Sequence, residues 1–325
     1  MHKNLIPGSL QRLIAGLVLV ALAQTAAAAY PDKTVRIIVP YSGGAADTMA
    51  RVIASKFSEI FKQNFIVESK TGANGIIGVD TVVKAPADGL TLLYEASTST
   101  FTPYLYKQVP YDLMKDVQPI GQLISYPYVI VVNPSVPARN FAELVKYLRD
   151  NGNRTNVASG SASLRVLGEL FKQIVGVDYT FIPYKGGGPA TISVMAGETQ
   201  MAFQDLPTVA PLVAGGRLRA IAVTGDKRSR ILPDVPTAKE TGLAADFVVT
   251  SWHGLFAPAN TPADIVNRLN SELNKVIAMP DVAARISSMG ADPAPGTANE
   301  FATSFRSQLM RWKEVTTRAQ IPLSD

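Results

Sequence analysis

Residues 35–61 read VRIIVPYSGGAADTMARVIASKFSEIF, and this stretch decides the fold class. Its β-branched beginning, Val35–Val39, is typical of a buried strand. Apolar side chains then recur at helical spacing through residues 49–61, which indicates an amphipathic helix after a glycine-containing loop. Because a strand followed directly by a helix is the repeating unit of α/β proteins, we expect an α/β fold with mainly parallel sheets.

The same alternation of short apolar runs and amphipathic segments continues toward the C-terminus. Further strands are expected at Phe65–Val67, Leu90–Leu93, Tyr128–Val132, Thr199–Phe203 and Leu218–Val223. Helices are expected from Asn140 to Gly152, from Leu164 to Val175, and from Pro189, Pro262 and Thr297 onward. Asn140 and Thr297 each have a Glu three positions later, which is the pattern of a capped helix start. Two sets of strand–helix units predict two lobes, each a mixed, mainly parallel sheet flanked by helices.

The first 29 residues have the features of a secretory signal peptide. Lys3 and Arg12 supply positive charge, Leu13–Ala23 is an apolar core, and small residues follow at Ala26–Ala29. The alternative is an uncleaved membrane anchor, for which this apolar core is short. We therefore expect cleavage near Ala29 and a mature chain that works outside the cytoplasm.

Composition excludes several classes of function. Removing Lys3 and Arg12 from the 31 Lys and Arg residues leaves 29 against 26 Asp and Glu, scattered without the basic stripe that nucleic-acid binding requires. The chain has no cysteine, which excludes thiolate catalysis, zinc–thiolate sites and iron–sulfur clusters. After the leader is removed, His253 is the one histidine left, and it has no partner at triad or metal spacing. We therefore expect His253 to be structural, with no catalytic residue, metal or cofactor.

Four loops and one acidic residue are candidates for a ligand site. The loops are Tyr41–Asp47, Tyr94–Thr100, Ala158–Arg165 and Tyr184–Pro189, and the acidic residue is Asp205. In open α/β sheets ligands bind where strands end and helices begin. The unpaired N–H groups and partial positive charge of helix N-termini favour anions there. This arrangement suggests a carboxylate ligand.

Each candidate also has an ordinary structural interpretation. The glycines of Tyr41–Asp47 suit a tight turn with Asp47 as a helix cap, and the hydroxyls of Tyr94–Thr100 suit a Ser/Thr turn. Arg165 could bind a carboxylate in bidentate fashion or lie solvated on its helix. Lys185 has no charged neighbour in sequence to shift its pKa, so exposure to solvent is expected. Asp205 could accept a ligand hydroxyl or amine, or cap the helix that follows it.

Taken in order, several segments resemble those of one family. They are Tyr30–Lys33, Val39–Asp47, Gly72–Gly75, Leu167–Phe171, Tyr184–Ala190, Leu218–Thr224, Leu232–Pro236 and Gly254–Pro258. Over essentially its whole mature length the chain is similar to the periplasmic receptors of tripartite tricarboxylate transporters, the Bug-type solute-binding proteins. The resemblance implies a two-lobed, Venus-flytrap fold of the type II periplasmic binding protein kind. It also implies an organic acid held between the lobes and delivered to a two-component membrane permease.

The resemblance further assigns roles to the loops. In this family the loops that match Tyr41–Asp47 and Ala96–Thr98 usually hold one carboxylate, and the loops of the second lobe close over the rest of the ligand. The ligand-binding residues expected on this basis are Tyr41, Ser42, Ala45, Ala46, Asp47, Ala96, Ser97, Thr98, Ser159, Ser161, Ser163, Arg165, Tyr184, Gly186 and Asp205.

Two positions depart from the family pattern. Ser161–Ser163 with Arg165 replaces a glycine-rich, often His-terminated segment, and Gln204-Asp205 replaces the usual Asp-Asn pair. Arg165 would favour a second carboxylate on the ligand if its side chain points inward. Asp205 would instead favour an amine or a hydroxyl. The sequence leaves both possibilities open.

The same resemblance gives expected lobe boundaries. Lobe 1 is expected at 30–125 plus 250–325 and lobe 2 at 126–249, with hinges near Ser125–Tyr128 and Phe247–Trp252. We expect a monomeric, non-catalytic receptor for a mono- or dicarboxylate, aromatic ones included. The alternatives are a ligand sensor that docks on a membrane signalling protein, and an exported hydrolase or lyase.

Overall fold

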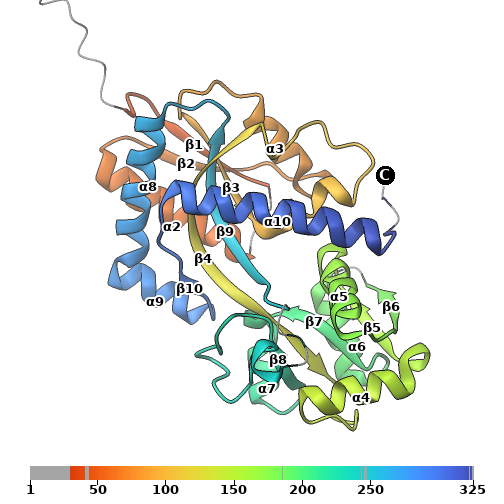
Figure 1. Ribbon diagram of the computed structural model, residues 1–325. Helices are drawn as coiled ribbons and strands as arrows, with labels where there is room; N and C mark the ends of the chain where they lie inside the picture. The colour runs from red at the N-terminus through yellow and green to blue at the C-terminus, as the bar shows by residue number, and fades with distance from the viewer. Residues whose placement is uncertain are drawn as a thin grey trace, which may run out of the picture.

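The computed structural model describes residues 30–40, 44–184, 186–242, 244, 247–321 and 323. The expected signal peptide, residues 1–29, lies outside these residues, as do Tyr41, Ser42 and Lys185. The described chain forms two α/β lobes, and the long strand β4 (Val117–Val132) runs from one lobe into the other (Figure 1).

Lobe 1 is built on a mixed sheet with helices on both faces. Its strands are β1 (Val35–Val39), β2 (Phe65–Ser69), β3 (Thr91–Ala96), β9 (Thr250–Pro258) and the first half of β4. β1 pairs in parallel with β2 and β3, whereas β9 runs antiparallel between β3 and β4. One face packs on α2 (Gly44–Phe61), α8 (Ala263–Ala278) and α9 (Pro280–Ser288), and the other packs on α3 (Ile76–Val83) and on α10 (Ala298–Arg318).

Lobe 2 repeats this plan on the second half of β4. Its other strands are β5 (Asn156–Ser159), β6 (Thr180–Pro183), β7 (Met201–Asp205) and β8 (Arg219–Val223). β5 pairs in parallel with β6 and β7, and β4 pairs antiparallel with β7 and β8. Helices α4 (Phe141–Asn151) and α5 (Ala162–Val175) cover one face, and α6 (Gly187–Ala196) and α7 (Leu206–Ala214) cover the other.

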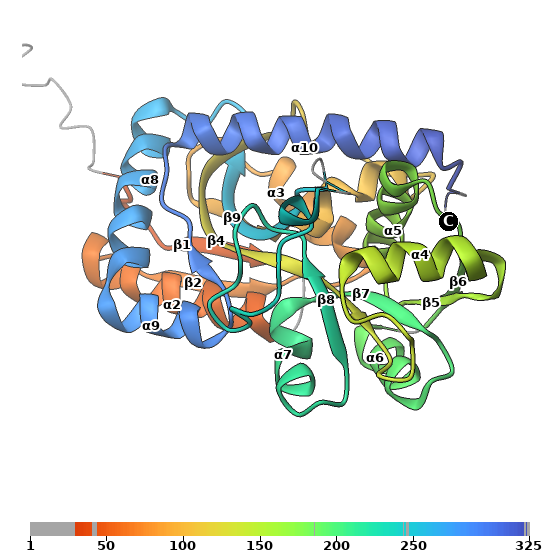
Figure 2. The ribbon, with the colours of Figure 1, turned by 60° about the horizontal axis from the view of Figure 1, so that its bottom comes forward.

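Two further elements lie at the junction of the lobes. The short strand β10 (Asp292–Pro293) pairs with β4 at Ser125 and Ile124, where β4 leaves lobe 1. Helix α10 runs along both lobes, with its first half against lobe 1 and its second half beside α5 (Figure 2). Trp312, near the end of α10, stacks on Phe101 with ring centroids 4.5 Å apart and belongs to the core of lobe 2.

Short 3₁₀ turns lie at Ala73–Gly75, Ser97–Thr100, Thr102–Tyr104, Gly152–Arg154 and Lys239–Thr241. Among the described helices, none combines the length and apolar character needed to cross a membrane.

The predicted helix caps are confirmed. The Asn140 side chain accepts a hydrogen bond from the backbone N–H of Glu143 at 2.9 Å. Thr297 and Glu300 form a reciprocal capping box at the start of α10. These contacts join residues three positions apart, so the local sequence determines them.

Two local predictions are wrong. Tyr94 was expected in a loop, but it lies in β3, which continues to Ala96. The Tyr94 side chain is fully buried. The helix expected from Pro189 begins at Gly187. The cap role that was one alternative for Asp47 does not apply, because α2 begins at Gly44 and the Asp47 carboxylate pairs with Arg51 at 2.9 Å.

Candidate functional site

The strand directions bring the carboxyl ends of both sheets to the junction of the lobes. β4 leaves lobe 1 and enters lobe 2, and β3 points the same way because both are antiparallel to β9. β7 is antiparallel to β4, so it points back toward lobe 1 and ends at Asp205, opposite Tyr128. The helices that follow these strands therefore begin at the junction, where their free N–H groups favour anions.

On the lobe 1 side, a chain of hydroxyl groups lines the junction. Ser97 opens the 3₁₀ turn after β3, and its Oγ lies 2.9 Å from Ser251 Oγ and 3.5 Å from the Tyr128 hydroxyl. Ser97 is buried, Ala96 is largely buried, and Thr98 is exposed. Burial raises the pKa of Tyr128 to about 12, so its hydroxyl stays protonated and able to donate.

Within the described residues, the β1–α2 loop contributes fewer residues to the candidate site than the sequence predicted. Tyr41 and Ser42 lie outside them, and α2 begins its described course at Gly44, which places Ala45 and Ala46 in its first turn. Asp47 is held by Arg51 and accepts a hydrogen bond from Ser69 at 3.2 Å. The Arg51 guanidinium lowers the pKa of the Asp47 carboxyl, so Asp47 stays ionised and engaged on the surface.

On the lobe 2 side, two loops meet through glycine. A Cβ atom added to Gly160 would lie 2.7 Å from the backbone of Gly186 and Gly187, so a side chain at this position would push the loops apart. Gly186 has a φ of 106°, a conformation that suits glycine. Tyr184, half-buried, donates its backbone N–H to the Ser159 carbonyl at 2.9 Å.

The serines of the β5–α5 loop mainly bind one another. Ser159 donates its hydroxyl to the Ser161 carbonyl at 2.9 Å. Ser161 caps α5 through Leu164 N–H, and its Oγ lies 2.9 Å from Ser163 Oγ. Ser161 is exposed, so its hydroxyl can still reach a ligand at the helix start.

Arg165 makes its contacts within lobe 2. Its guanidinium carbon lies 5.7 Å from the centroid of the Phe181 ring on β6. Its Nε lies 4.0 Å from a carboxylate oxygen of Glu169, one turn further along α5, and 40% of its side chain is exposed. Burial raises the pKa of Glu169, and the nearby cations Lys172 and Arg165 partly offset this effect.

Asp205 lies at a cavity that both lobes line. The cavity has a volume of about 270 Å³ and is formed by Ile124, Tyr126, Asp205, Pro207, Thr208, Met289 and Ala291. Asp205 stands at the cap position of α7, but its side chain makes no capping hydrogen bond. Burial raises the pKa of its carboxyl to about 6. The charge of Asp205 also contributes, after burial, to raising the pKa of Tyr126 and of Tyr128.

Next to this cavity, one loop of lobe 2 touches lobe 1. Arg230, in the segment after β8, forms an ion pair with Asp292 of β10. A Cβ atom added to Gly290 would lie 2.5 Å from Ile231 Cδ1, so the two segments are in close contact. The lobes therefore meet at the edge of the cavity as well as along β4.

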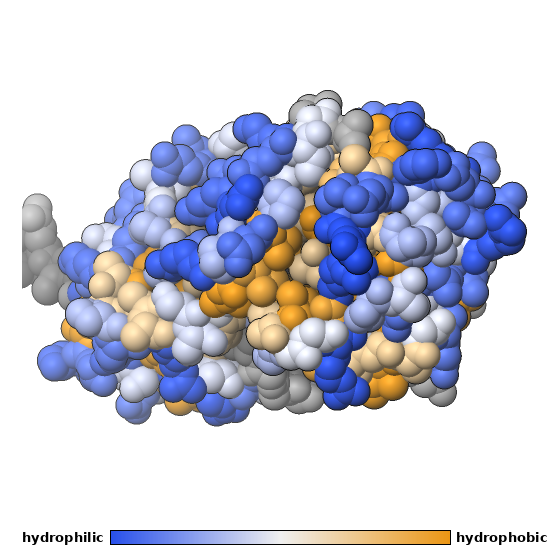
Figure 3. Space-filling model, turned by 90° about the horizontal axis from the view of Figure 1, so that it is seen from below, coloured by the Kyte–Doolittle hydropathy of each residue, from blue (hydrophilic) through white to orange (hydrophobic). Residues whose placement is uncertain are grey.

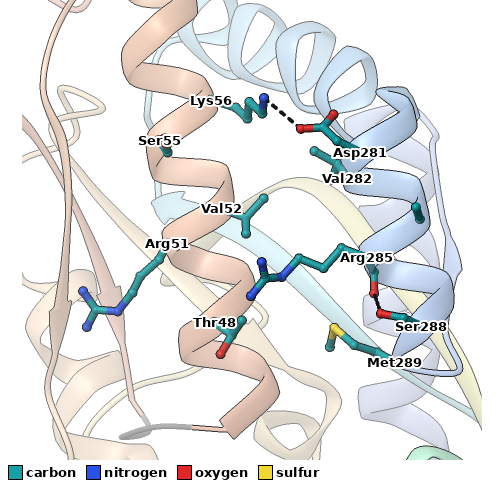
Figure 4. Close-up of a pocket in the computed structure, with 11 residues that line it drawn as sticks. Thr48, Arg51, Val52, Ser55, Lys56, Asp281, Val282, Arg285, Ser288 and Met289 are labelled. Atoms are coloured by element: carbon teal, nitrogen blue, oxygen red, sulfur yellow. Dashed lines mark hydrogen bonds and ion pairs between the residues drawn. The ribbon is translucent and has the colours of Figure 1, made fainter.

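A separate hollow between α2 and α9 is larger, at about 1080 Å³ (Figure 4). Lys56 and Asp281 form an ion pair of 3.0 Å across it, and Arg285 points from α9 into it. All of its lining residues belong to lobe 1, so closure of the two lobes would not enclose it. We place the candidate site at the Asp205 cavity because residues from both lobes form it.

Sequence reasoning missed several residues of the junction. Tyr126 and Ser251 face each other in the β4–β9 ladder, and Met289 and Ala291 follow α9. The buried side chain of Gln204 has an Nε2 without a hydrogen-bond partner among the described residues. The tyrosines near the predicted crossover at residues 125–128 were the one feature of the sequence that could have indicated these residues. The other positions come together only through pairing of distant strands.

His253 is enclosed in lobe 1, in agreement with its expected structural role. It is 4% exposed, and its Nδ1 lies 2.9 Å from the Tyr94 hydroxyl. Burial lowers the pKa of its imidazole to about 4. No group of three His, Cys, Asp or Glu side chains suited to a metal ion occurs in the described part of the chain.

Comparisons with known proteins agree with this architecture. Residues 49–321 match the family model described as "Tripartite tricarboxylate transporter family receptor". BugT of Bordetella pertussis is 30% identical over 298 residues, which cover 90% of this chain and 91% of BugT.

Two solved structures of Rhodopseudomonas palustris proteins share the fold. One, Rpa4515 with adipate, has 29% identity and a TM-score of 0.76, and the match covers 91% of this chain and 100% of that protein. The other, MatC with bound malate, has 28% identity and a TM-score of 0.71, and covers 88% and 99% of the two chains. The chain therefore belongs to the tripartite tricarboxylate transporter receptor family, whose members are solute-binding receptors of the Bug type.

Proposed function

We propose that this protein is a periplasmic receptor that captures a small organic carboxylate between its lobes and delivers it to a two-component membrane permease. The observation that carries the proposal is the junction itself, where the carboxyl ends of both sheets, three helix starts of lobe 2 and a cavity lined by both lobes meet. The adipate and malate held by the two Rhodopseudomonas relatives support a carboxylate as the ligand class.

The residues expected to bind the carboxylate are those whose backbone N–H groups begin helices at the junction. Ser97 and Thr98 would act from lobe 1, and Ser161, Ser163 and Gly186 would act from lobe 2. Helix N-termini bind anions through unpaired N–H groups, so this role does not require a cationic side chain.

Capture would proceed by rotation of the lobes about two crossovers, near residues 125–128 and 247–252. Thr224 of lobe 2 joins these crossovers, because its Oγ1 accepts from Tyr128 N–H at 3.0 Å and donates to the Val249 carbonyl. The proposed lobes are 30–125 plus 250–325 and 126–249. Small changes in backbone angles at two such crossovers are the usual basis of hinge closure.

The proposal includes no reaction. The single imidazole of the exported chain, His253, is buried and neutral at physiological pH, so it cannot serve as a general base for a ligand at the junction. We expect a monomer that leaves the cytoplasm by means of the leader cleaved near Ala29.

A thermal-shift screen of the purified protein against mono-, di- and tricarboxylates tests the proposal. A ligand present at a hundredfold excess over its Kd stabilises the folded state by about 2.7 kcal/mol, which raises Tm by a few degrees. Small-angle scattering with the same ligand should show a more compact molecule. If no organic acid changes Tm, the receptor proposal fails.

A further inference from the structure

The cavity beside Asp205 has a mainly apolar lining. Ile124, Pro207, Met289 and Ala291 provide apolar walls, and Tyr126, Thr208 and Asp205 provide the polar atoms. Seen from below, apolar side chains gather in the middle of the molecule and polar side chains surround them (Figure 3). The cavity volume of about 270 Å³ leaves room for a short carbon chain.

Among the described residues that line the cavity, Asp205 is the single charged one. Within the described residues its carboxylate has neither a hydrogen-bond donor nor a cation beside it. Arg230, a cation of the lobe contact beside the cavity, is paired with Asp292. An ionised carboxylate in an apolar cavity is costly unless it gains a partner, so the partner is expected to arrive with the ligand.

The cavity is within reach of the proposed carboxylate-binding loops. Tyr126 lines the cavity and lies opposite Ser251 in the β4–β9 ladder, and Ser251 Oγ is 2.9 Å from Ser97 Oγ. A ligand whose carboxylate lies at the start of the Ser97 turn can therefore extend its other end toward Asp205.

We infer that Asp205 selects ligands that carry a hydrogen-bond donor, an ammonium or a hydroxyl group, at the end distal to their carboxylate. The inference rests on the proposed receptor function and names the ligand class for its site. A distal ammonium forms a charge-assisted hydrogen bond with Asp205. A second carboxylate would lie beside a like charge in a medium of low dielectric, which disfavours the ionised form of both groups.

The test compares ligands of matched length by isothermal titration calorimetry at pH 8. One series is 6-aminohexanoate, 6-hydroxyhexanoate, hexanoate and adipate, and a shorter one is 4-aminobutyrate, 4-hydroxybutyrate, butyrate and succinate. For the wild-type protein we expect the amino or hydroxy acid to bind at least tenfold more tightly than the dicarboxylate of the same length. We expect Asp205→Asn to reduce this ratio at least tenfold.

A matched control is Asp234→Asn, which removes the same charge from an exposed position of lobe 2 that does not line the cavity. It should keep the wild-type preference. Far-ultraviolet circular dichroism and Tm establish that each variant is folded, and the wild-type series decides the question even without the variants.

Three results would overturn the inference. A wild-type preference for the dicarboxylate, or equal binding of hexanoate and 6-aminohexanoate, would refute the role of Asp205 while leaving the receptor function intact. A donor preference that persists in Asp205→Asn would assign selection to another residue. If no acid of either series or of the thermal-shift screen binds, the receptor proposal and this inference both fail.

Discussion

Two polar groups lie near Tyr126, the buried His253 and the half-buried Asp205, and their surroundings differ sharply. His253 and Tyr94 are nearly unexposed and form a hydrogen bond of 2.9 Å with each other. Asp205 instead faces a cavity, and the described residues offer its carboxylate no partner. The His253 ring is in edge-to-face contact with Tyr126 at 6.0 Å, so the two regions are neighbours.

The presence or absence of a hydrogen-bond partner distinguishes a polar group that stabilises the fold from one that binds a ligand. A buried polar pair that satisfies its own hydrogen bonds stabilises one arrangement of strands. A half-buried acid without a partner lowers the stability of the ligand-free protein, and perturbed groups of this kind cluster at functional sites. This comparison makes four predictions, which we order by the size of the expected effect.

The largest effect is expected from His253→Ala. The substitution removes a fully packed ring and leaves the buried Tyr94 hydroxyl without its partner, so we expect a loss of about 4 kcal/mol in the free energy of unfolding. Urea denaturation at pH 8 measures it. Tyr94→Phe, which keeps the ring, should cost about 1–2 kcal/mol. A loss below about 1 kcal/mol for His253→Ala would show that the pair is not structural.

The cost of His253→Ala should shrink at low pH. The folded-state pKa of His253, about 4, lies below its unfolded value of 6.5. Between these two pH values the imidazole binds a proton in the unfolded chain but not in the folded protein. The free energy of unfolding of the wild type therefore falls as the pH falls. At pH 4.5 the difference between wild type and variant should be smaller by about 2–3 kcal/mol than at pH 8. An unchanged difference would place the imidazole in contact with solvent.

Asp205→Asn should raise the free energy of unfolding, whereas His253→Ala lowers it. The folded-state pKa of Asp205 is raised from 3.8 to about 6, so the ionised carboxylate destabilises the folded state above pH 6, and the effect disappears as the pH falls toward 4. The rise corresponds to at most about 3 kcal/mol, and solvent contact reduces it. We expect the variant to be more stable than wild type by about 1–2 kcal/mol at pH 8 and equally stable at pH 4.

Denaturation of ligand-free protein at the two pH values checks the Asp205 prediction. Asp234→Asn again serves as the control and should change stability little at either pH. A variant less stable than wild type at pH 8 would mean that Asp205 has a stabilising partner and is not waiting for a ligand.

The sequence predicted best what depends on neighbouring residues. The caps at Asn140 and Thr297 follow from contacts within a few positions. The α/β class and the two lobes followed from the alternation of strands and helices and, more specifically, from the family resemblance.

The cavity could not be predicted in the same way. Ile124, Asp205 and Met289 are far apart in the chain, and the pairing of β4 with β7 and β10 brings them together. The sequence predicted a strand at Thr199–Phe203, which overlaps β7, but it gave no indication of β10, which is two residues long. It predicted only the end of β4, at Tyr128–Val132, whereas β4 begins at Val117 and includes Ile124. The absence of a partner for Asp205 is likewise a property of the folded surroundings.

The smallest effect is expected from Arg165→Ala, the other charge of lobe 2 that the sequence offered as a ligand contact. Its guanidinium lies over Phe181 and beside Glu169, with 40% of the side chain exposed. Such a partly exposed pair contributes about 0.5–1 kcal/mol, so stability should change by no more than that.

Ligand binding decides between the two charges. We expect Arg165 to stay with Phe181 and Glu169 in the closed protein. Arg165→Ala should then change the affinities for adipate and for 6-aminohexanoate by the same small factor, below about threefold. Asp205→Asn should instead change the ratio of the two affinities. Arg165→Lys, which keeps the charge and loses the planar fork, separates an electrostatic contribution from a bidentate one. A selective loss of dicarboxylate binding in Arg165→Ala would instead show that Arg165 leaves Phe181 on closure and binds the distal carboxylate, and the selecting charge of the site would then be positive.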